Sequence, residues 1–383
     1  MKALELFAGG GGLAVALSQT GFETSRVVEW DQWACKTLSD NRELLKCRHE
    51  GPIEPTDVRA VRFADFEGRV DIVTGGPPCQ PFSLGGKHQA YDDKRDMFPQ
   101  AIRALREAKP KAFMFENVRG LTRASFSHYL EYIQFQLQYP AIEKKADELW
   151  TDHRRRLEQH HTAHHETDLE YRIVPRLVNA ADYGVPQRRE RFIIVGIRAD
   201  LNLEWHFPEA THSLDALVKS QWDDQSYWGR HDIRPRTELL EVPSVRAALA
   251  RPSLNTRKPW LTTRDALAEL AKSKNKALTN NESRAGARSY PGHTGSDLDL
   301  PSKTLKAGVH GVPGGENMFV QDDKSVRYFT AREAASIQTF PEEYVFSGAW
   351  SEAMRQIGNA VPVRLAAAVT RQLFHDLSFA KAC

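Results

Sequence analysis

This chain of 383 residues has few cysteines, no long apolar run and almost no net charge. The four cysteines are scattered, without the paired spacing of a zinc site or the density of a disulfide framework, which favours a reducing, cytoplasmic setting. No stretch approaches the roughly 18 uninterrupted apolar residues of a membrane span. We therefore expect an intracellular protein that does not enter a membrane.

The charges nearly cancel, because 52 Lys and Arg residues oppose 50 Asp and Glu residues and leave a net charge of +2. This balance excludes a histone-like polycation, but it permits a nucleic-acid partner that binds a local basic surface. The hydrophobic share of 41% is that of a globular protein, and the length predicts two or three domains.

Strand and helix patterns alternate through the first 200 residues. Short apolar runs predict strands over residues 3–7, 25–29, 70–74, 112–116 and 191–196. Helical spacing lies between them, as over residues 13–18 and 99–109. The alternation predicts a doubly wound α/β sheet in a domain over residues 1–200, with ligands bound beyond the carboxyl ends of the strands.

Two later regions have a different composition. Residues 141–170 are densely charged and lack Gly and Pro, which predicts a helical insertion with a solvated face. Histidine pairs at 160–161 and 164–165 have a spacing that can hold a metal, but no carboxylate backs them and we expect no metal. Residues 201–321 have little periodicity and predict a second, irregular domain. Within it, residues 251–288 carry six more basic than acidic side chains, which are either simply solvated or placed to contact phosphates.

A glycine-rich turn follows the first predicted strand. Residues 7–12 read Phe-Ala-Gly-Gly-Gly-Gly and open a helix, so the glycines permit a tight turn and close approach of a ligand. Glu29, twenty residues after Gly9, ends the next strand, where its carboxylate can accept hydrogen bonds from ribose hydroxyls. The pattern favours an adenosine-containing cofactor over a ligand-free connection, without separating a dinucleotide from S-adenosylmethionine.

Candidate reactive residues follow three further strands. Cys79 lies in Gly-Gly-Pro-Pro-Cys-Gln-Pro-Phe-Ser, whose prolines fix the backbone, and it is either a nucleophile or a small buried side chain. Glu116 ends an apolar strand and is either a partnered carboxyl with a raised pKa or an exposed strand end. In Gln-Arg-Arg-Glu-Arg, a strand period of two puts Arg189 and Arg191 on one face, either in a surface ion-pair run or aimed into a cleft.

Together these motifs resemble the DNA cytosine-C5 methyltransferase family. The glycine turn, the cysteine segment, Glu-Asn-Val at 116–118, Gln-Arg-Arg-Glu-Arg at 187–191, and the segments 327–341 and 356–362 occur in the order of that family. The resemblance implies a large S-adenosylmethionine-binding lobe, a target-recognition domain at 201–321, and a segment 322–383 that returns to the large lobe. It also implies a bacterial modification enzyme that is monomeric, cytoplasmic and associated with the nucleoid.

The resemblance also implies roles for individual residues. Cys79 would add to cytosine C6, Glu116 would donate to N3 and accept from the exocyclic amine, and Arg189 and Arg191 would hold O2 of a flipped base. The implied cofactor contacts are Phe7, Gly9, Gly11, Glu29, Trp30, Asp57, Pro78 and Asn359. The implied contacts to double-stranded DNA are Ser83 and Lys87, on a lid over residues 83–96, and Arg257, Lys258 and Arg264.

The sequence departs from the family pattern at two places, and three alternative functions compete with this interpretation. Glu5 stands where the family often has Asp, and the insertion at 141–170 leaves room for a partner. The alternatives are a tRNA methyltransferase of the same family, an inert DNA-binding protein, and an NAD-dependent oxidoreductase. The last explains neither Cys79 nor Glu116, so we set it aside. A cognate restriction endonuclease is expected as a possible partner, and the recognised DNA sequence is not encoded in any motif.

Overall fold

The structure is a computed structural model that describes residues 1–49, 51–78, 96–163, 167–251, 256–273, 278–291, 294–307 and 317–380. The chain forms two compact units. Unit 1 comprises Met1–Val178, Glu190–Phe207 and Ala366–Cys383, and unit 2 comprises Asn179–Arg189 and Pro208–Leu365. Residues 322–365, which the sequence assigned to a C-terminal segment of the catalytic lobe, therefore lie in unit 2.

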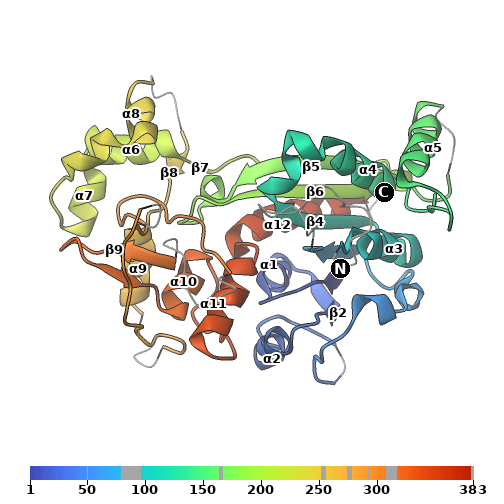
Figure 1. The fold of residues 1–383 in the computed structure, drawn as a ribbon, viewed down its shortest axis with the longest axis horizontal. Helices are drawn as coiled ribbons and strands as arrows, with labels where there is room; N and C mark the ends of the chain where they lie inside the picture. The colour runs from blue at the N-terminus through green and yellow to red at the C-terminus, as the bar shows by residue number, and fades with distance from the viewer. Residues whose placement is uncertain are drawn as a thin grey trace. The chain divides into compact units, whose positions relative to one another are not determined.

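A six-stranded sheet forms the centre of unit 1 in the described part of the chain (Figure 1). Its strands are β1 (Lys2–Leu6), β2 (Glu23–Val28), β3 (Ile72–Gly75), β4 (Ala112–Val118), β5 (Tyr171–Asn179) and β6 (Glu190–Arg198). They lie in the order β2-β1-β3-β4-β6-β5. Strands β1 to β4 pair in parallel, whereas β6 runs antiparallel to β4. The predicted α/β sheet is confirmed, with one reversal that the sequence pattern did not reveal.

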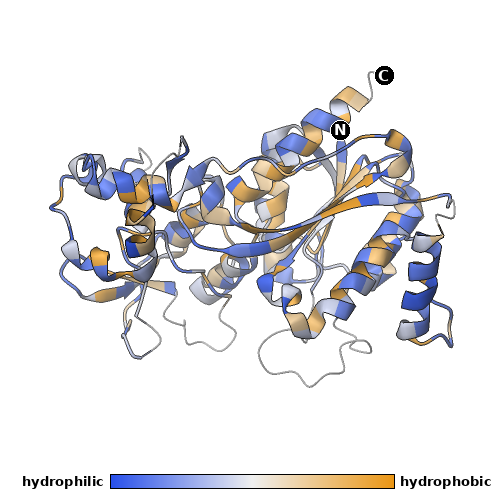
Figure 2. Ribbon diagram, turned by 90° about the horizontal axis from the view of Figure 1, so that it is seen from above, coloured by the Kyte–Doolittle hydropathy of each residue, from blue (hydrophilic) through white to orange (hydrophobic). Residues whose placement is uncertain are grey.

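Helices pack against both faces of this sheet. Those of unit 1 are α1 (Gly12–Thr20), α2 (Gln32–Asp40), α3 (Phe98–Ala108), α4 (Ser127–Gln138), α5 (Trp150–Thr162) and α12 (Val363–Ala380), whose first three residues belong to unit 2. One face, with Leu4, Leu6 and Phe113, buries apolar residues of α3 and α4. Figure 2 shows these strands as a hydrophobic centre. Because side chains alternate along a strand, Ala3 and Glu5 face the opposite side.

Helix α5 is the helical part of the charged insertion, and it is hydrophilic along most of its length (Figure 2). Its inner side is packed: His153 is buried, with Nδ1 2.9 Å from the Tyr132 hydroxyl and Nε2 2.8 Å from the Ile142 carbonyl oxygen. The Tyr139 ring packs against His160, and its hydroxyl lies 2.7 Å from His161 Nδ1. Of these histidines only His153 is buried, whereas His160 is half-buried and His161 is exposed. Residues 164–166 lie outside the described residues.

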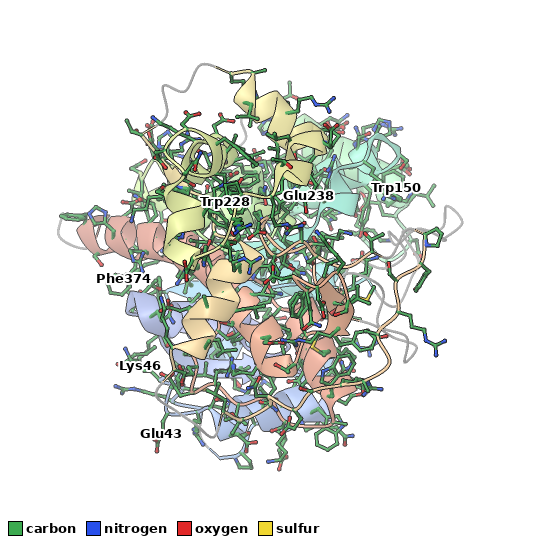
Figure 3. All side chains as sticks on the ribbon, turned by 90° about the vertical axis from the view of Figure 1, so that its left-hand side faces the viewer. Glu43, Lys46, Trp150, Trp228, Glu238 and Phe374 are labelled. Carbon is green, nitrogen blue, oxygen red and sulfur yellow. The ribbon has the colours of Figure 1, made fainter. Side chains whose placement is uncertain are left out.

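Unit 2 contains more regular structure than its sequence predicted. Its strands are β7 (His212–Ser213), β8 (Lys258–Pro259), β9 (Met318–Val320) and β10 (Val326–Tyr328). Its helices are α6 (Leu214–Trp222), α7 (Ser226–His231), α8 (Pro243–Leu249), α9 (Thr263–Ala271), α10 (Ala331–Ile337) and α11 (Trp350–Asn359). Tyr227 and Trp228 of α7 anchor a small apolar core, in which Figure 3 labels Trp228.

Candidate active site

The glycine-rich turn connects β1 to α1 through three left-handed backbone positions. Phe7, Gly9 and Gly11 have φ angles of 53°, 54° and 83°. The Gly11 N–H donates to the Ala8 carbonyl oxygen at 3.0 Å, which closes the turn. A Cβ atom on Gly9 would meet nothing within 4 Å, and no side chain caps the first turn of α1. The turn therefore leaves open space beside backbone N–H groups that favour a negatively polarised ligand.

Glu29, directly after β2, connects this turn to the next loop. Its Oε2 accepts the Gly9 N–H at 2.7 Å, and its Oε1 accepts the N–H groups of Trp30 and Asp31 at 2.8 Å each. Because a carboxylate has about four acceptor positions, about one remains for a ligand hydroxyl while these three bonds stay in place. The Trp30 side chain is 67% exposed beside it.

Asp57 lies on the segment next to Glu29, since the Thr56 N–H donates to the Glu29 carbonyl oxygen at 2.7 Å. Its carboxylate accepts from the backbone and Nε of Arg59, which hold the Asp57 pKa below its usual range. The structure thus brings Phe7, Gly9, Gly11, Glu29, Trp30 and Asp57 together near the carboxyl ends of β1 and β2.

A buried ion pair joins the ends of β4 and β6. Arg191 Nε lies 2.7 Å from Glu116 Oε1, and the two side chains are 10% and 9% exposed. The antiparallel register pairs Val118 with Arg191, so the beginning of β6 lies beside the end of β4. Burial lowers the pKa of Arg191, and the Glu116 carboxylate acts in the opposite direction. The side chains are therefore fixed in orientation by each other.

The loop that leads to Cys79 packs against this ion pair. A Cβ atom on Gly76 would lie 3.4 Å from Glu116 Oε2, which is van der Waals contact. Asn117 Nδ2 donates to the Pro77 carbonyl oxygen at 3.0 Å, and Pro78 is exposed. Cys79, Ser83 and Lys87 lie outside the described residues. The roles of Gly76 and Asn117 were missed by sequence reasoning, although both stand inside the quoted motifs.

Arg189 has different partners from Arg191, and this corrects the expectation that both hold the substrate. Strand β6 begins at Glu190, so the period of two does not extend to Arg189. The Arg189 side chain is 1% exposed and donates to the carbonyl oxygens of Leu305, Gly358 and Ala360 in unit 2. A guanidinium buried against three carbonyls is a structural group, so we no longer assign Arg189 to the base.

The expected DNA contacts on unit 2 are of two kinds, exposed side chains and a largely buried one. Arg257 and Lys258 are exposed on unit 2. Arg264 is 13% exposed and pairs with Asp299 at 2.6 Å, and its Nη2 lies 2.6 Å from Asp322. Because its charge is neutralised inside the unit, Arg264 is corrected from a phosphate contact to a structural residue. Asn359, at the end of α11, is exposed between buried neighbours.

Metal ligands in a cluster and membrane-spanning helices are both missing from the described residues. No group of three or more His, Cys, Asp and Glu side chains there is arranged to hold a metal ion. No helix in that part of the chain is long and apolar enough to cross a membrane.

Comparison with known proteins identifies the family. The model of the C-5 cytosine-specific DNA methylase family matches residues 1–139 and 149–375, so the chain belongs to this family. It is a DNA cytosine-5-methyltransferase, as the sequence motifs predicted. The unmatched residues 140–148 end two positions before the start of α5, and from residue 141 onward they fall within the expected insertion.

Bacterial relatives match over nearly the whole chain. The Type II methyltransferase M.Eco47II of Escherichia coli is 33% identical, over 98% of this chain and 79% of the relative. The Type II methyltransferase M.PspPI of Psychrobacter sp. is 31% identical, over 98% and 80%.

Solved structures agree on the fold. The S. pombe Dnmt2 methyltransferase has a TM-score of 0.58 at 17% identity, covering 99% of this chain and 100% of that one. A putative DNA modification methyltransferase encoded within an E. coli prophage has a TM-score of 0.54 at 21% identity, covering 99% of each. At these identities the likeness concerns the fold alone.

Proposed function

We propose that this enzyme transfers a methyl group from S-adenosylmethionine to C5 of a cytosine within a specific double-stranded DNA sequence. We propose further that it is the modification enzyme of a restriction–modification system, which the Type II names of the relatives support. It would act as a monomer in the bacterial cytoplasm, where its DNA substrate lies. A cognate endonuclease would cut the same sequence when it is unmethylated.

The residues around the glycine turn fit the proposed cofactor. Open space at Gly9, the uncapped start of α1 and the exposed Trp30 ring offer a backbone cradle and an apolar surface for an adenosine. When bound, S-adenosylmethionine supplies a methyl group on a sulfonium, which is a strong electrophile. The proposed contacts are Phe7, Gly9, Gly11, Glu29, Trp30, Asp57, Pro78 and Asn359.

The observation that carries the proposed chemistry is the buried Glu116–Arg191 pair, packed against Gly76 three residues before Cys79. Cytosine C5 is a weak nucleophile, so a thiolate adds to C6 first and makes C5 electron-rich. Cys79 is proposed to form this C6–S bond. After methyl transfer, C5 loses its proton to a base, and the electron pair of the C5–H bond expels the Cys79 thiolate from C6.

Glu116 and Arg191 are proposed to polarise the cytosine. Glu116 would hydrogen-bond N3 and accept from the exocyclic amine, which draws electrons from C6. Arg191 would donate to O2 and stabilise the charge that develops there. Their mutual contact keeps both groups in place before the base arrives.

DNA binding would require a flipped base and a basic surface. Extrusion of cytosine from the stack costs a few kcal/mol, which contacts to the DNA backbone offset. Ser83 and Lys87 are proposed to contact DNA near the flipped base, and Arg257 and Lys258 to contact phosphates. Binding is therefore expected to weaken steeply as salt increases.

Trapping with 5-fluorocytosine tests the covalent step. Fluorine at C5 cannot leave as the proton does, so DNA with 5-fluorocytosine at the target position should form a stable protein adduct when S-adenosylmethionine is added. Cys79→Ser should form none, whereas Cys47→Ser removes a buried thiol of unit 1 and should form the adduct normally. An adduct formed by Cys79→Ser would contradict the assignment.

Transfer of labelled methyl tests the substrate. Double-stranded DNA and tRNA are incubated in parallel with the enzyme and labelled S-adenosylmethionine. Label should enter DNA, and bisulfite sequencing of DNA from cells that express the enzyme should locate it in one short sequence. Label in tRNA alone would overturn the proposal.

A further inference from the structure

The buried Arg189 side chain contacts the turn that follows α11. Its Nη2 donates to the carbonyl oxygens of Gly358 at 2.7 Å and Ala360 at 3.0 Å. These two residues flank Asn359. The last carbonyls of a helix have no partner within the helix, and a cation at that end is favourable. Arg189 therefore closes the end of α11 with a charge and two hydrogen bonds.

Two glutamines complete the same arrangement. Gln338 Nε2 donates to the carbonyl oxygens of Ile357 at 2.7 Å and Ala360 at 3.2 Å. Gln187 Nε2 donates to Gln338 Oε1 at 3.1 Å, and both glutamine side chains are fully buried. The carbonyls before and after Asn359 are thus held by a connected set of side chains.

A second segment, Leu305 to Ala307, packs against this turn. A Cβ atom on Gly358 would lie 2.5 Å from the Ala307 nitrogen, so only glycine fits there. Arg189 Nη1 and Gln187 Oε1 fix that segment through the Leu305 carbonyl oxygen at 3.0 Å and N–H at 3.1 Å. The turn is therefore fastened from two sides, while Asn359 itself remains exposed between buried neighbours.

We infer that Arg189 and Gln187 are positioning residues for Asn359, and that the motif Gln-Arg-Arg-Glu-Arg serves two tasks. Arg191 orients Glu116, whereas Gln187 and Arg189 present the Asn359 side chain to the cofactor. This inference rests on the proposed function, in which Asn359 binds S-adenosylmethionine. It predicts that changes at Arg189 act on cofactor affinity, and that changes at Arg191 act on kcat.

The test is a double-mutant cycle between Arg189→Lys and Asn359→Ala. Lysine keeps the charge but cannot reproduce the planar fork that donates to three carbonyls. We expect each single variant to weaken S-adenosylmethionine binding about tenfold, the usual effect of losing one hydrogen bond to a charged or well-placed group. In the Asn359→Ala background, Arg189→Lys should weaken binding no further, because its effect passes through the missing side chain.

Binding is measured by calorimetric titration of the full-length enzyme with S-adenosylmethionine, and kcat and KM for DNA by labelled methyl transfer. Arg188→Ala, at the exposed neighbouring arginine, is the matched control and should bind the cofactor normally. If Arg189→Lys does not fold, Gln187→Leu removes the adjacent contacts and takes its place in the cycle.

Three results would overturn the inference, each for a different reason. Additive losses in the double variant would show that Arg189 merely stabilises unit 2. Normal cofactor affinity with a reduced kcat in Arg189→Lys would indicate that Arg189 contacts the flipped cytosine after all. Normal cofactor affinity in Asn359→Ala would remove the proposed cofactor role of Asn359, and with it the basis of the inference.

Discussion

Glu5 places a carboxyl group in the centre of unit 1, and its ionisation should make folding depend on pH. The side chain is fully buried on β1, between Val27 of β2 and Thr74 of β3. Burial raises the Glu5 pKa from its ordinary 4.5 to about 8; the Ala14 amide lowers it in part and the charge of Glu29 adds to the increase. The folded chain therefore keeps this proton at pH values where the unfolded chain has lost it.

The sign of the effect follows from proton linkage. Because the pKa is raised in the folded state, the full stability is present below about pH 4.5 and is lost as pH rises toward about 8. The difference between these two pKa values corresponds to about 5 kcal/mol as an upper value, of which about 3 kcal/mol falls between pH 5.5 and 8. Above pH 8 both states are ionised and the loss levels off.

Glu5→Gln isolates this contribution, since glutamine has the shape of the protonated acid and does not ionise. Urea unfolding followed by tryptophan fluorescence gives the free energy of unfolding of both proteins at pH 5.5, 7 and 8.5. The variant should gain stability relative to the wild type as pH rises. The control Glu54→Gln removes an exposed carboxylate of unit 1. If the stability difference between wild type and Glu5→Gln is the same at all three pH values, the burial argument is refuted.

Two further predictions concern packing and charge. Gly196→Ala on β6 should destabilise the enzyme by about 1–3 kcal/mol in thermal unfolding, because its Cβ would lie 2.1 Å from the Phe113 ring. A melting temperature equal to that of the wild type would contradict this. Arg264→Met should destabilise unit 2 by about 2 kcal/mol, because the buried Asp299 carboxylate keeps only Arg236 of its two cationic partners, whereas Lys258→Ala, at an exposed lysine, should leave the melting temperature unchanged. DNA titrations at several salt concentrations should show that Lys258→Ala lowers the slope of log K against log salt by about 0.9, and an unchanged slope would exclude a phosphate contact.

Local sequence patterns predicted much of the sheet of unit 1. All five predicted strands agree with β1, β2, β3, β4 and β6 to within two residues at each end. Strand β5 was missed because Pro175 stands inside it, and proline removes a donor from a sheet. The position of β5 at the end of the strand order explains why the sheet tolerates it there. Edge position is a property of topology, and no local pattern encodes it.

The helices of unit 2 had local signals that composition concealed. Ser213 caps α6, and Thr262 forms a capping box with Asp265 at the start of α9. Such caps mark helix starts even where apolar periodicity is weak. The count of charges over residues 251–288 was misleading for a different reason. It treated every basic side chain in that range as part of a basic surface, although Asp299 and Asp322, outside the range, neutralise Arg264.

The different positions of Arg189 and Arg191 show why the motif alone could not assign their roles. A period of two predicts a shared face only while both residues belong to one strand, and β6 begins between them. Glu116 is the neighbour of Arg191 because the reversed strand places the two strand ends in register, a pairing between residues 75 positions apart. Arg189 finds its acceptors more than 110 positions later in the chain. Long-range pairing therefore gives residues of one short motif two roles. Arg191 orients Glu116, and Arg189 holds the turn at Asn359.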